Sequence, residues 1–317
     1  MKHRILQAGR LLPSLEARLA AEFDTHLLAS EAEPKAFLAA HGGGFDGFVT
    51  SAGVGISAAT MDKMPTLRAV SSFGVGLDKL DLAAAKARGI AVGYTPDVLN
   101  DCVADLAMVL MLDVARRVSE SDRFVRRGDW VKPGLASFPL GRKVSGAKLG
   151  IVGLGRIGQT IARRAAAFDM QIRYHSRRPV AGAAWPHEPS LIEMARWCDF
   201  MIVITAGGAG TRHLVDEAVL NALGPRGFIV NVARGSVIDE AALLRALVDK
   251  RIAGAALDVF DDEPKVPPEL FGLDNVVLLP HIASATQETR QAMVDRVFDN
   301  LQGFFREGRM VSPAPLP

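Results

Sequence analysis

A glycine-rich turn between a buried strand and an amphipathic helix constrains the fold more than any other feature. Apolar residues at 149–152 predict the strand, and apolar residues at every third or fourth position of 156–168 predict the helix. A second strand is predicted at 171–175, where a βαβ unit requires one. Such a unit binds a dinucleotide, with the pyrophosphate at the N-terminal end of the helix. The turn that would hold the pyrophosphate has the spacing GxGxxG and consists of Gly153, Leu154, Gly155, Arg156, Ile157 and Gly158.

The residues after the second strand indicate which dinucleotide is bound. An NAD-selective site places Asp or Glu there, to accept a hydrogen bond from the ribose 2′-hydroxyl. This chain has Ser176, Arg177 and Arg178 instead. The serine can donate a hydrogen bond to a 2′-phosphate and the arginines can pair with its charge, whereas the alternative interpretation is two solvated surface arginines. The sequence therefore predicts NADP as the cofactor, with NADPH preferred over NADH.

Length and composition limit the remaining possibilities. A chain of 317 residues is long for one hydrophobic core and suits two domains. Its longest apolar runs are too short to span a membrane. The net charge of +2 and the lack of a basic run with interleaved aromatic residues argue against nucleic acid as a partner. The 2 cysteines lie far apart in the sequence, which predicts neither a disulfide nor a metal site and favours a reducing cytoplasm.

Two series of alternating strands and helices predict an α/β protein with two domains. The second series predicts a doubly wound parallel (Rossmann) sheet, with strands at residues 148–152, 171–175, 200–204, 228–231, 253–257 and 276–279. The first series predicts a smaller, flavodoxin-like α/β domain. The last helix, 284–307, follows the final strand of the second series, so we expect the chain to return there to the first domain. The predicted domains are a substrate-binding domain of residues 1–98 and 284–317, and a dinucleotide-binding domain of residues 99–283. The proline-rich tail at 312–317 is expected to be extended and mobile.

Polar side chains lie at the ends of the late strands, where open α/β sheets bind ligands. Arg234 follows one buried strand, His281 leaves the last strand, and Glu263 lies in a loop between them. Reduction of a 2-keto acid needs a cation to hold the carboxylate and polarise the carbonyl, and an acid to protonate its oxygen. Arg234 and His281 can supply these, while Glu263 would stabilise the imidazolium and orient the ring. Taken singly, each has a structural alternative: a capping arginine, a solvated loop acid and a strand-end histidine.

Further motifs give the chain a resemblance that extends over nearly its whole length. They are VSSFGVGLD at 70–78, GYTPDVL at 93–99, the glycine turn, VARG at 232–235, LDVF at 257–260 with Glu263-Pro264, and PHI at 280–282. In these motifs the chain resembles the D-isomer-specific 2-hydroxyacid dehydrogenase family, and most closely its glyoxylate/hydroxypyruvate reductases and hydroxyphenylpyruvate reductases.

The resemblance implies roles for individual residues. The catalytic arginine, glutamate and acid/base histidine would be Arg234, Glu263 and His281. Arg234 and His281 would also bind the substrate, whose carboxylate would be held by the backbone N–H groups of Val75 and Gly76. Asp258 would bind the nicotinamide amide, and the cofactor would also be lined by Thr205, Val232 and Ala233. Family members often have a Leu-Pro-Leu-Thr-like stretch where this chain has GGAG at 207–210, so contacts there are not carried over.

These observations predict an NADPH-preferring reductase of small 2-keto acids, with glyoxylate and hydroxypyruvate as the leading substrates and no metal. A reductase of a larger keto acid, such as hydroxyphenylpyruvate or 2-ketogluconate, would share every catalytic residue. A formate dehydrogenase is less favoured, because its reaction needs no acid/base proton transfer. A dinucleotide-sensing protein without turnover is disfavoured by the intact arginine, glutamate and histidine.

A homodimer is predicted from one helix and one loop. Residues 100–127 predict a single helix that is too apolar to stand alone in solvent, and the loop after it carries Trp130 and Phe138. The resemblance likewise implies that these segments pair two subunits. We further expect the loop 134–140 of a neighbouring subunit to place Phe138 as a cap over a small substrate, the alternative being a stacking partner for an aromatic one.

Overall fold

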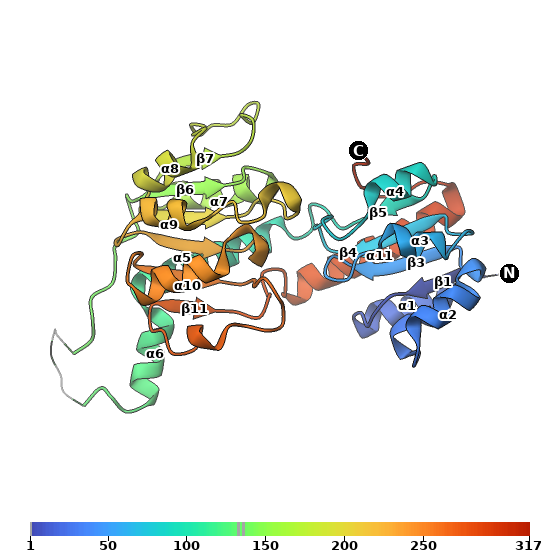
Figure 1. Ribbon diagram of the computed structural model, residues 1–317, viewed down its shortest axis with the longest axis horizontal. Helices are drawn as coiled ribbons and strands as arrows, with labels where there is room; N and C mark the ends of the chain where they lie inside the picture. The colour runs from blue at the N-terminus through green and yellow to red at the C-terminus, as the bar shows by residue number, and fades with distance from the viewer. Residues whose placement is uncertain (1, 132–133, 135–136) are drawn as a thin grey trace. The chain divides into compact units, whose positions relative to one another are not determined.

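The computed structural model describes residues 2–131, 134 and 137–317. The chain divides into two compact units, which we call unit 1 (Met1–Leu99 with Ala285–Pro317) and unit 2 (Asn100–Ser284) (Figure 1). Each unit contains one sheet, and all pairings between the strands of these sheets are parallel. The predicted α/β class is therefore confirmed. Within the described ranges, no helix has both the length and the apolar surface that a bilayer crossing requires.

Unit 1 is built on a five-stranded sheet in the order β2-β1-β3-β4-β5, which is the flavodoxin-like order. The strands are β1 (Arg4–Gln7), β2 (Asp24–Leu27), β3 (Gly47–Ser51), β4 (Ala69–Phe73) and β5 (Ala91–Gly93). The helices are α1 (Pro13–Glu22), α2 (Pro34–His41), α3 (Ala58–Asp62), α4 (Leu82–Ala87) and α11 (Gln287–Glu307). Short 3-10 turns lie at Leu28–Ser30 and Gly42–Gly44.

The middle of this sheet is buried on both faces. Every residue of β4 is buried. Val70 packs into an apolar cluster on one face, and the neighbouring Ser71 donates a hydrogen bond from Oγ to the Val297 carbonyl of α11 at 3.1 Å on the other. Helix α11 begins after Thr286, whose side chain accepts a hydrogen bond from the Thr289 N–H. The C-terminal helix is thus an integral layer of unit 1.

The chain end departs from the expectation of a mobile tail. Its extended segment forms an antiparallel bridge between Pro313 and Gly93 at the edge of β5. The Ala314 N–H donates to the Val92 carbonyl at 2.8 Å, and Ser312 donates its N–H to the buried Asn300 Oδ1 at 2.8 Å. These bonds hold the tail against the sheet, because the short strand β5 leaves backbone groups open for pairing.

Unit 2 is built on a six-stranded sheet in the order β11-β10-β9-β8-β6-β7. The strands are β6 (Lys148–Val152), β7 (Gln171–His175), β8 (Phe200–Val203), β9 (Phe228–Asn231), β10 (Gly254–Leu257) and β11 (Val276–Leu278). They are the strands predicted from the sequence, to within one residue at either end. Outside β7, an isolated parallel bridge joins Tyr174 to His187, at the place of the third strand in the usual Rossmann order.

Helices cover both faces of the unit 2 sheet (Figure 1). Strand residues such as Val203 and Ile229 form one apolar cluster with residues of α8 (Leu191–Trp197), α9 (Glu217–Leu223) and α10 (Glu240–Val248). The other face contacts α5 (Asn100–Arg116), and a Cβ at Gly254 of β10 would lie 3.0 Å from Val114 of that helix. Helix α7 (Arg156–Ala166) packs against α5. Short 3-10 turns lie at Ala209–Thr211, Gly235–Val237 and Pro268–Leu270.

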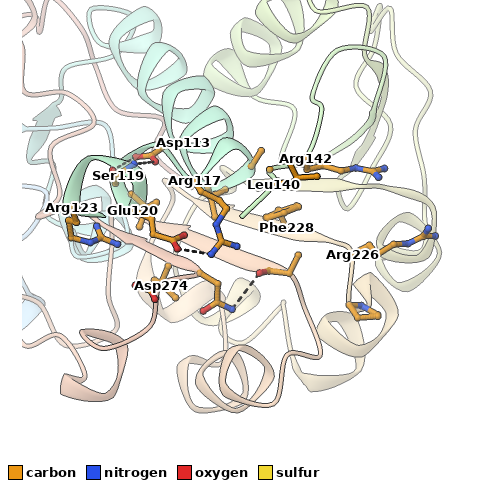
Figure 2. A pocket seen from close by; sticks show the side chains of 18 residues that line it. Asp113, Arg117, Ser119, Glu120, Arg123, Leu140, Arg142, Arg226, Phe228 and Asp274 are labelled. Carbon is orange, nitrogen blue, oxygen red and sulfur yellow. Dashed lines mark hydrogen bonds and ion pairs between the residues drawn. The ribbon is translucent and has the colours of Figure 1, made fainter. Parts of the chain in front are cut away.

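The prediction of one helix over 100–127 is wrong, because Arg117 separates α5 from α6 (Val118–Arg126). Arg117 has a φ of 57°, in the left-handed region that ends regular helical hydrogen bonding. The Asp113 carboxylate accepts a hydrogen bond from the Ser119 N–H at 2.8 Å, and Arg117 donates to Glu120 Oε1 at 2.6 Å (Figure 2). Asp113 therefore caps the first turn of α6, which stabilises the break.

Phe138, the predicted substrate cap, packs against its own chain. Its ring contacts Phe124 of α6 edge-on, with the ring centroids 5.2 Å apart, and the Arg117 guanidinium lies 5.8 Å from its centroid. Leu135 and Ala136, which belong to the loop 134–140, lie outside the described residues. A role of this loop at the substrate site of a second subunit stays a prediction.

Candidate active site

The functional residues predicted in unit 2 gather at one edge of its sheet. Because the six strands are parallel, their C-terminal ends lie along the same edge. The segments that leave this edge carry the glycine turn after β6, Ser176 after β7, Thr205 after β8, Val232, Ala233 and Arg234 after β9, Asp258 after β10, and His281 after β11.

The geometry of the glycine turn fits a pyrophosphate. Gly153 has a φ of 103°, and a Cβ there would lie 2.8 Å from the backbone of Thr205. A Cβ at Gly158 would lie 2.1 Å from the Gly153 carbonyl oxygen, so this glycine allows α7 to pack closely on the turn. At Gly155, by contrast, the structure describes no atom within 4 Å of such a Cβ. The turn therefore leaves open space beside the N–H groups that begin α7.

The loop after β7 carries positive charge, and no acidic residue stands directly after the strand. Arg177 and Arg178 are exposed, and neither has a carboxylate partner among the described residues. The Ser176 hydroxyl donates to the Arg178 carbonyl at 2.6 Å and so closes the turn that carries the arginines, and its contact with a 2′-phosphate stays a prediction. Two unpaired guanidinium groups without an acidic neighbour fit a 2′-phosphate.

His281 and Glu263 are in direct contact at this edge. His281 Nδ1 lies 2.7 Å from Glu263 Oε2, and the other carboxylate oxygen accepts a hydrogen bond from the Phe260 N–H at 3.1 Å. Burial alone would raise the pKa of Glu263, but the hydrogen bond and charge of His281, the Phe260 N–H and the charge of Arg234 together hold it below its usual range. An ionised carboxylate only accepts hydrogen bonds, so Nδ1 is the donor and Nε2 is left for the substrate. The His281 side chain is 47% exposed, as proton transfer to a ligand requires.

Asn231 fixes the backbone that carries Arg234. This residue is 1% exposed at the end of β9; its Oδ1 accepts from the Ala233 N–H and its Nδ2 donates to the Arg234 carbonyl, both at 3.0 Å. Gly235 then allows a close approach, because a Cβ there would lie 1.9 Å from the backbone carbon of Phe260. Asn231 was not predicted from the sequence, although a polar residue that ends an otherwise apolar strand is a signal for such a role.

Asp258 supports the segment that carries His281. Its side chain is fully buried, and the carboxylate accepts hydrogen bonds from the Ile282 N–H at 2.7 Å and the Ala283 N–H at 2.9 Å. Its carbonyl accepts from the His281 N–H at 2.9 Å, and His281 has a φ of 54°. Burial raises the pKa of Asp258, and the two backbone N–H groups oppose that shift only in part. The contact between Asp258 and a nicotinamide amide remains a prediction beside this structural role.

The turn after β4 in unit 1 carries the predicted carboxylate-binding residues. Gly74 has a φ of 138°, its N–H donates to Thr95 Oγ1 at 3.1 Å, and its carbonyl accepts from the Thr95 N–H at 3.1 Å. Among the described residues, nothing accepts a hydrogen bond from the N–H groups of Val75 and Gly76. This fixed turn can therefore offer two adjacent donors to an anion.

A cavity of about 290 Å³ lies at the opposite edge of the unit 2 sheet (Figure 2). Phe228 and Val276, the first residues of β9 and β11 respectively, line it together with Arg117 and Glu120 at the junction of α5 and α6. None of the candidate catalytic residues lines this cavity. The candidate catalytic residues and the cavity thus lie at opposite ends of the strands.

The chain and its structure are similar to those of several known proteins. The family described as "D-isomer specific 2-hydroxyacid dehydrogenase, NAD binding domain" matches residues 108–283. A glyoxylate/hydroxypyruvate reductase A of Arabidopsis thaliana is 45% identical over 94% of this chain and 95% of its own length. A hydroxyphenylpyruvate reductase of Plectranthus scutellarioides is 43% identical over the same shares. The structure is also similar, with a TM-score of 0.90 and 42% identity over 99% of this chain and 97% of the other, to an NADPH-dependent glyoxylate/hydroxypyruvate reductase of Sinorhizobium meliloti in complex with NADP and malonate.

Proposed function

Because the chain belongs to the D-isomer specific 2-hydroxyacid dehydrogenase family, we propose that it reduces small 2-keto acids, foremost glyoxylate and hydroxypyruvate, to D-2-hydroxy acids with NADPH. It is an NAD(P)-dependent oxidoreductase of the glyoxylate/hydroxypyruvate reductase type. The observation that carries the proposal is the 2.7 Å contact between Glu263 and His281 at the sheet edge that also holds the glycine turn.

The residues at this edge can supply what reduction of a keto acid requires. The Arg234 guanidinium can bind the carboxylate and attract electrons from the adjacent carbonyl. The His281 ring, held through Nδ1 by Glu263, can donate a proton from Nε2 to the carbonyl oxygen. NADPH, when bound, supplies the hydride that the carbonyl carbon accepts. The glycine turn would hold its pyrophosphate, and Arg177 with Arg178 would hold its 2′-phosphate.

We expect the purified protein to reduce glyoxylate and hydroxypyruvate with a higher kcat/KM for NADPH than for NADH. Charge-assisted hydrogen bonds contribute about 1.5–3 kcal/mol each, so a single one would give a preference of about 10- to 150-fold, and a second one would raise it further. The measurement is NADPH and NADH oxidation over a panel of keto acids that includes hydroxyphenylpyruvate and 2-ketogluconate. The double variant Arg177→Ala/Arg178→Ala should lose most of the preference and keep its activity with NADH.

Two controls make this assay decisive. The double variant Arg245→Ala/Arg251→Ala removes the same charge from arginines that pair with Glu217, and it should keep the cofactor preference. Equal efficiency of the wild type with both cofactors would exclude the NADPH assignment. A higher kcat/KM for hydroxyphenylpyruvate than for glyoxylate would favour the larger-substrate alternative, to which the similarity with the Plectranthus enzyme also points.

The same proposal includes a homodimer. Exposed apolar side chains lie on and after α5 and α6, and they include Val109, Val118, Val125, Trp130 and Leu140. Exposed apolar side chains on successive segments are typical of a surface that associates with a partner. Light scattering at micromolar concentration should therefore give twice the chain mass of 33.9 kDa. The variant Val118→Glu/Val125→Glu should lower that mass, and a wild-type protein that stays monomeric would contradict the proposal.

We also assign the protein to the cytoplasm. Among the described residues, neither Cys102 nor Cys198 forms a disulfide. Cys198 is buried, and its burial raises the pKa of the thiol to about 12, so little of the reactive thiolate forms at neutral pH. Cysteines outside disulfides are typical of proteins in a reducing compartment.

A further inference from the structure

Backbone hydrogen bonds at the outer edge of the unit 2 sheet hold the loop that carries Arg177 and Arg178. Beyond β7, the Tyr174 N–H donates to the Pro186 carbonyl at 3.0 Å, and the Glu188 N–H donates to the Tyr174 carbonyl at 2.7 Å. These bonds place residues 186–188 parallel to the end of β7. The intervening loop, 176–185, is therefore anchored at both ends, and Arg177 and Arg178 lie in its first turn.

Two side chains from this edge hold the first turn of the loop. The Tyr174 hydroxyl accepts a hydrogen bond from the Val180 N–H at 2.8 Å. His187 Nε2 lies 2.9 Å from the Ser176 carbonyl oxygen, which can only accept, so Nε2 is the donor. The two rings pack together with their centroids 5.1 Å apart, and Tyr174 is 1% exposed. The backbone is thus fixed on both sides of the arginines.

Among the described residues, the arginine side chains themselves form no ion pair that would hold the loop in place. Arg177 and Arg178 contact no carboxylate within the described part of the chain, and both are exposed. Ordering a flexible loop around a ligand costs conformational entropy, and a loop already held in the binding conformation avoids part of that cost. Contacts beneath the loop can therefore alter the affinity for an anion that they do not touch.

We infer that Tyr174 and His187 are positioning residues, which hold the Ser176–Arg178 turn in the conformation that receives the 2′-phosphate of the cofactor. This inference rests on the proposed preference for NADPH. It assigns part of the discrimination between the two cofactors to side chains that lie beneath the loop. Because the 2′-phosphate is the only group that distinguishes the cofactors, loss of either contact should affect one cofactor and spare the other.

The variant Tyr174→Phe removes one oxygen atom and keeps the ring. Calorimetry would measure its affinity for adenosine 2′,5′-bisphosphate and for 5′-AMP, which differ only in the 2′-phosphate. We expect the variant to bind the bisphosphate about three- to tenfold more weakly, the effect of one lost hydrogen bond, and to bind 5′-AMP within about twofold of the wild type. KM for NADPH should rise by a similar factor, while kcat and KM for NADH stay unchanged.

A pair of variants at the second residue gives an independent test. His187→Leu removes the donor to the Ser176 carbonyl and should weaken binding of the bisphosphate in the same way. His187→Gln places an amide N–H near the position of Nε2 and should restore most of the affinity. Ile172→Val is the matched control, because it shortens another buried side chain of β7 that makes no hydrogen bond to the loop. It should leave both affinities unchanged.

The outcomes separate this inference from the proposed function. If Tyr174→Phe and His187→Leu weaken both ligands equally, or weaken neither, while Arg177→Ala/Arg178→Ala abolishes the preference for the bisphosphate, only the positioning role is overturned. If the wild type binds the bisphosphate no better than 5′-AMP, the NADPH preference fails and the positioning role fails with it. Selective loss of bisphosphate affinity in both variants, with rescue by His187→Gln, would establish the inference.

Discussion

Replacement of His281 by alanine is expected to lower kcat by about 10²–10⁴-fold, the usual contribution of a positioned general acid. The expected loss is large because the ring supplies the proton that the carbonyl oxygen needs as the hydride arrives. Glu263 holds Nδ1 at 2.7 Å, and this contact leaves Nε2 as the transferring atom. Steady-state oxidation of NADPH with glyoxylate, at saturating concentrations of both, is the measurement.

The control for this variant is cofactor binding. Quenching of protein fluorescence by NADPH should give a Kd within about twofold of the wild type, because His281 lies after β11 and the glycine turn lies after β6. The variant His41→Ala changes a histidine at the end of α2, which is assigned no role, and should keep full activity. Near-normal turnover by His281→Ala would contradict its role as the proton donor and favour the alternative of a structural histidine at a strand end.

Replacement of Asp258 by asparagine is expected to reduce both stability and turnover. Its carboxylate is fully buried and accepts two backbone N–H groups, and an amide can accept only one of them and turns an N–H group toward the other. A hydrogen bond to a charged group contributes about 1.5–3 kcal/mol, and a buried donor left unpaired costs about 1–3 kcal/mol. The free energy of unfolding should therefore fall by about 2–4 kcal/mol, as measured by urea denaturation.

The effect on turnover follows from the backbone at His281. A non-glycine residue with a φ of 54° is held there by the surrounding hydrogen bonds, and three of these come from Asp258. Weakening them should let the ring leave its place, so kcat should fall at least tenfold, a factor that corresponds to about 1.4 kcal/mol. The matched control is Asp262→Asn, since Asp262 forms an exposed ion pair with Lys265 and should change stability by less than about 0.5 kcal/mol. Unchanged kcat in Asp258→Asn would show that His281 keeps its place without this support.

The sequence predicted the sheets well because their central strands are buried on both faces. Parallel strands such as β6 and β8 are read as short continuous apolar runs, and glycine turns and polar residues mark where they end. The candidate site was predictable for the same reason. In a parallel sheet, residues that directly follow the strands must meet at one edge, so Arg234 and His281 could be placed together from their positions alone.

The features that the sequence did not predict depend on contacts between side chain and backbone. The break at Arg117 depends on Asp113, whose carboxylate reaches across the junction to Ser119, while the helical pattern continues without interruption. Residues 186–188 pair with β7 through too few residues to produce a strand pattern. The hydrogen bonds of Asp258 could not be predicted from the sequence either, because a buried aspartate after a strand can bind a cofactor amide or a neighbouring loop equally well.

Unit 1 consists of two stretches that lie before and after unit 2 in the sequence, and this arrangement affects the order in which the two units can fold during synthesis. Residues 100–284 form unit 2 from one continuous stretch, so its sheet can assemble before the rest of the chain has been synthesised. Strand β4, although made early, lacks its covering helix α11 until the ribosome has passed residue 307. Residues 313 and 314, which pair with β5, are made after α11, so this pairing forms only after all the strands of the sheet have been synthesised.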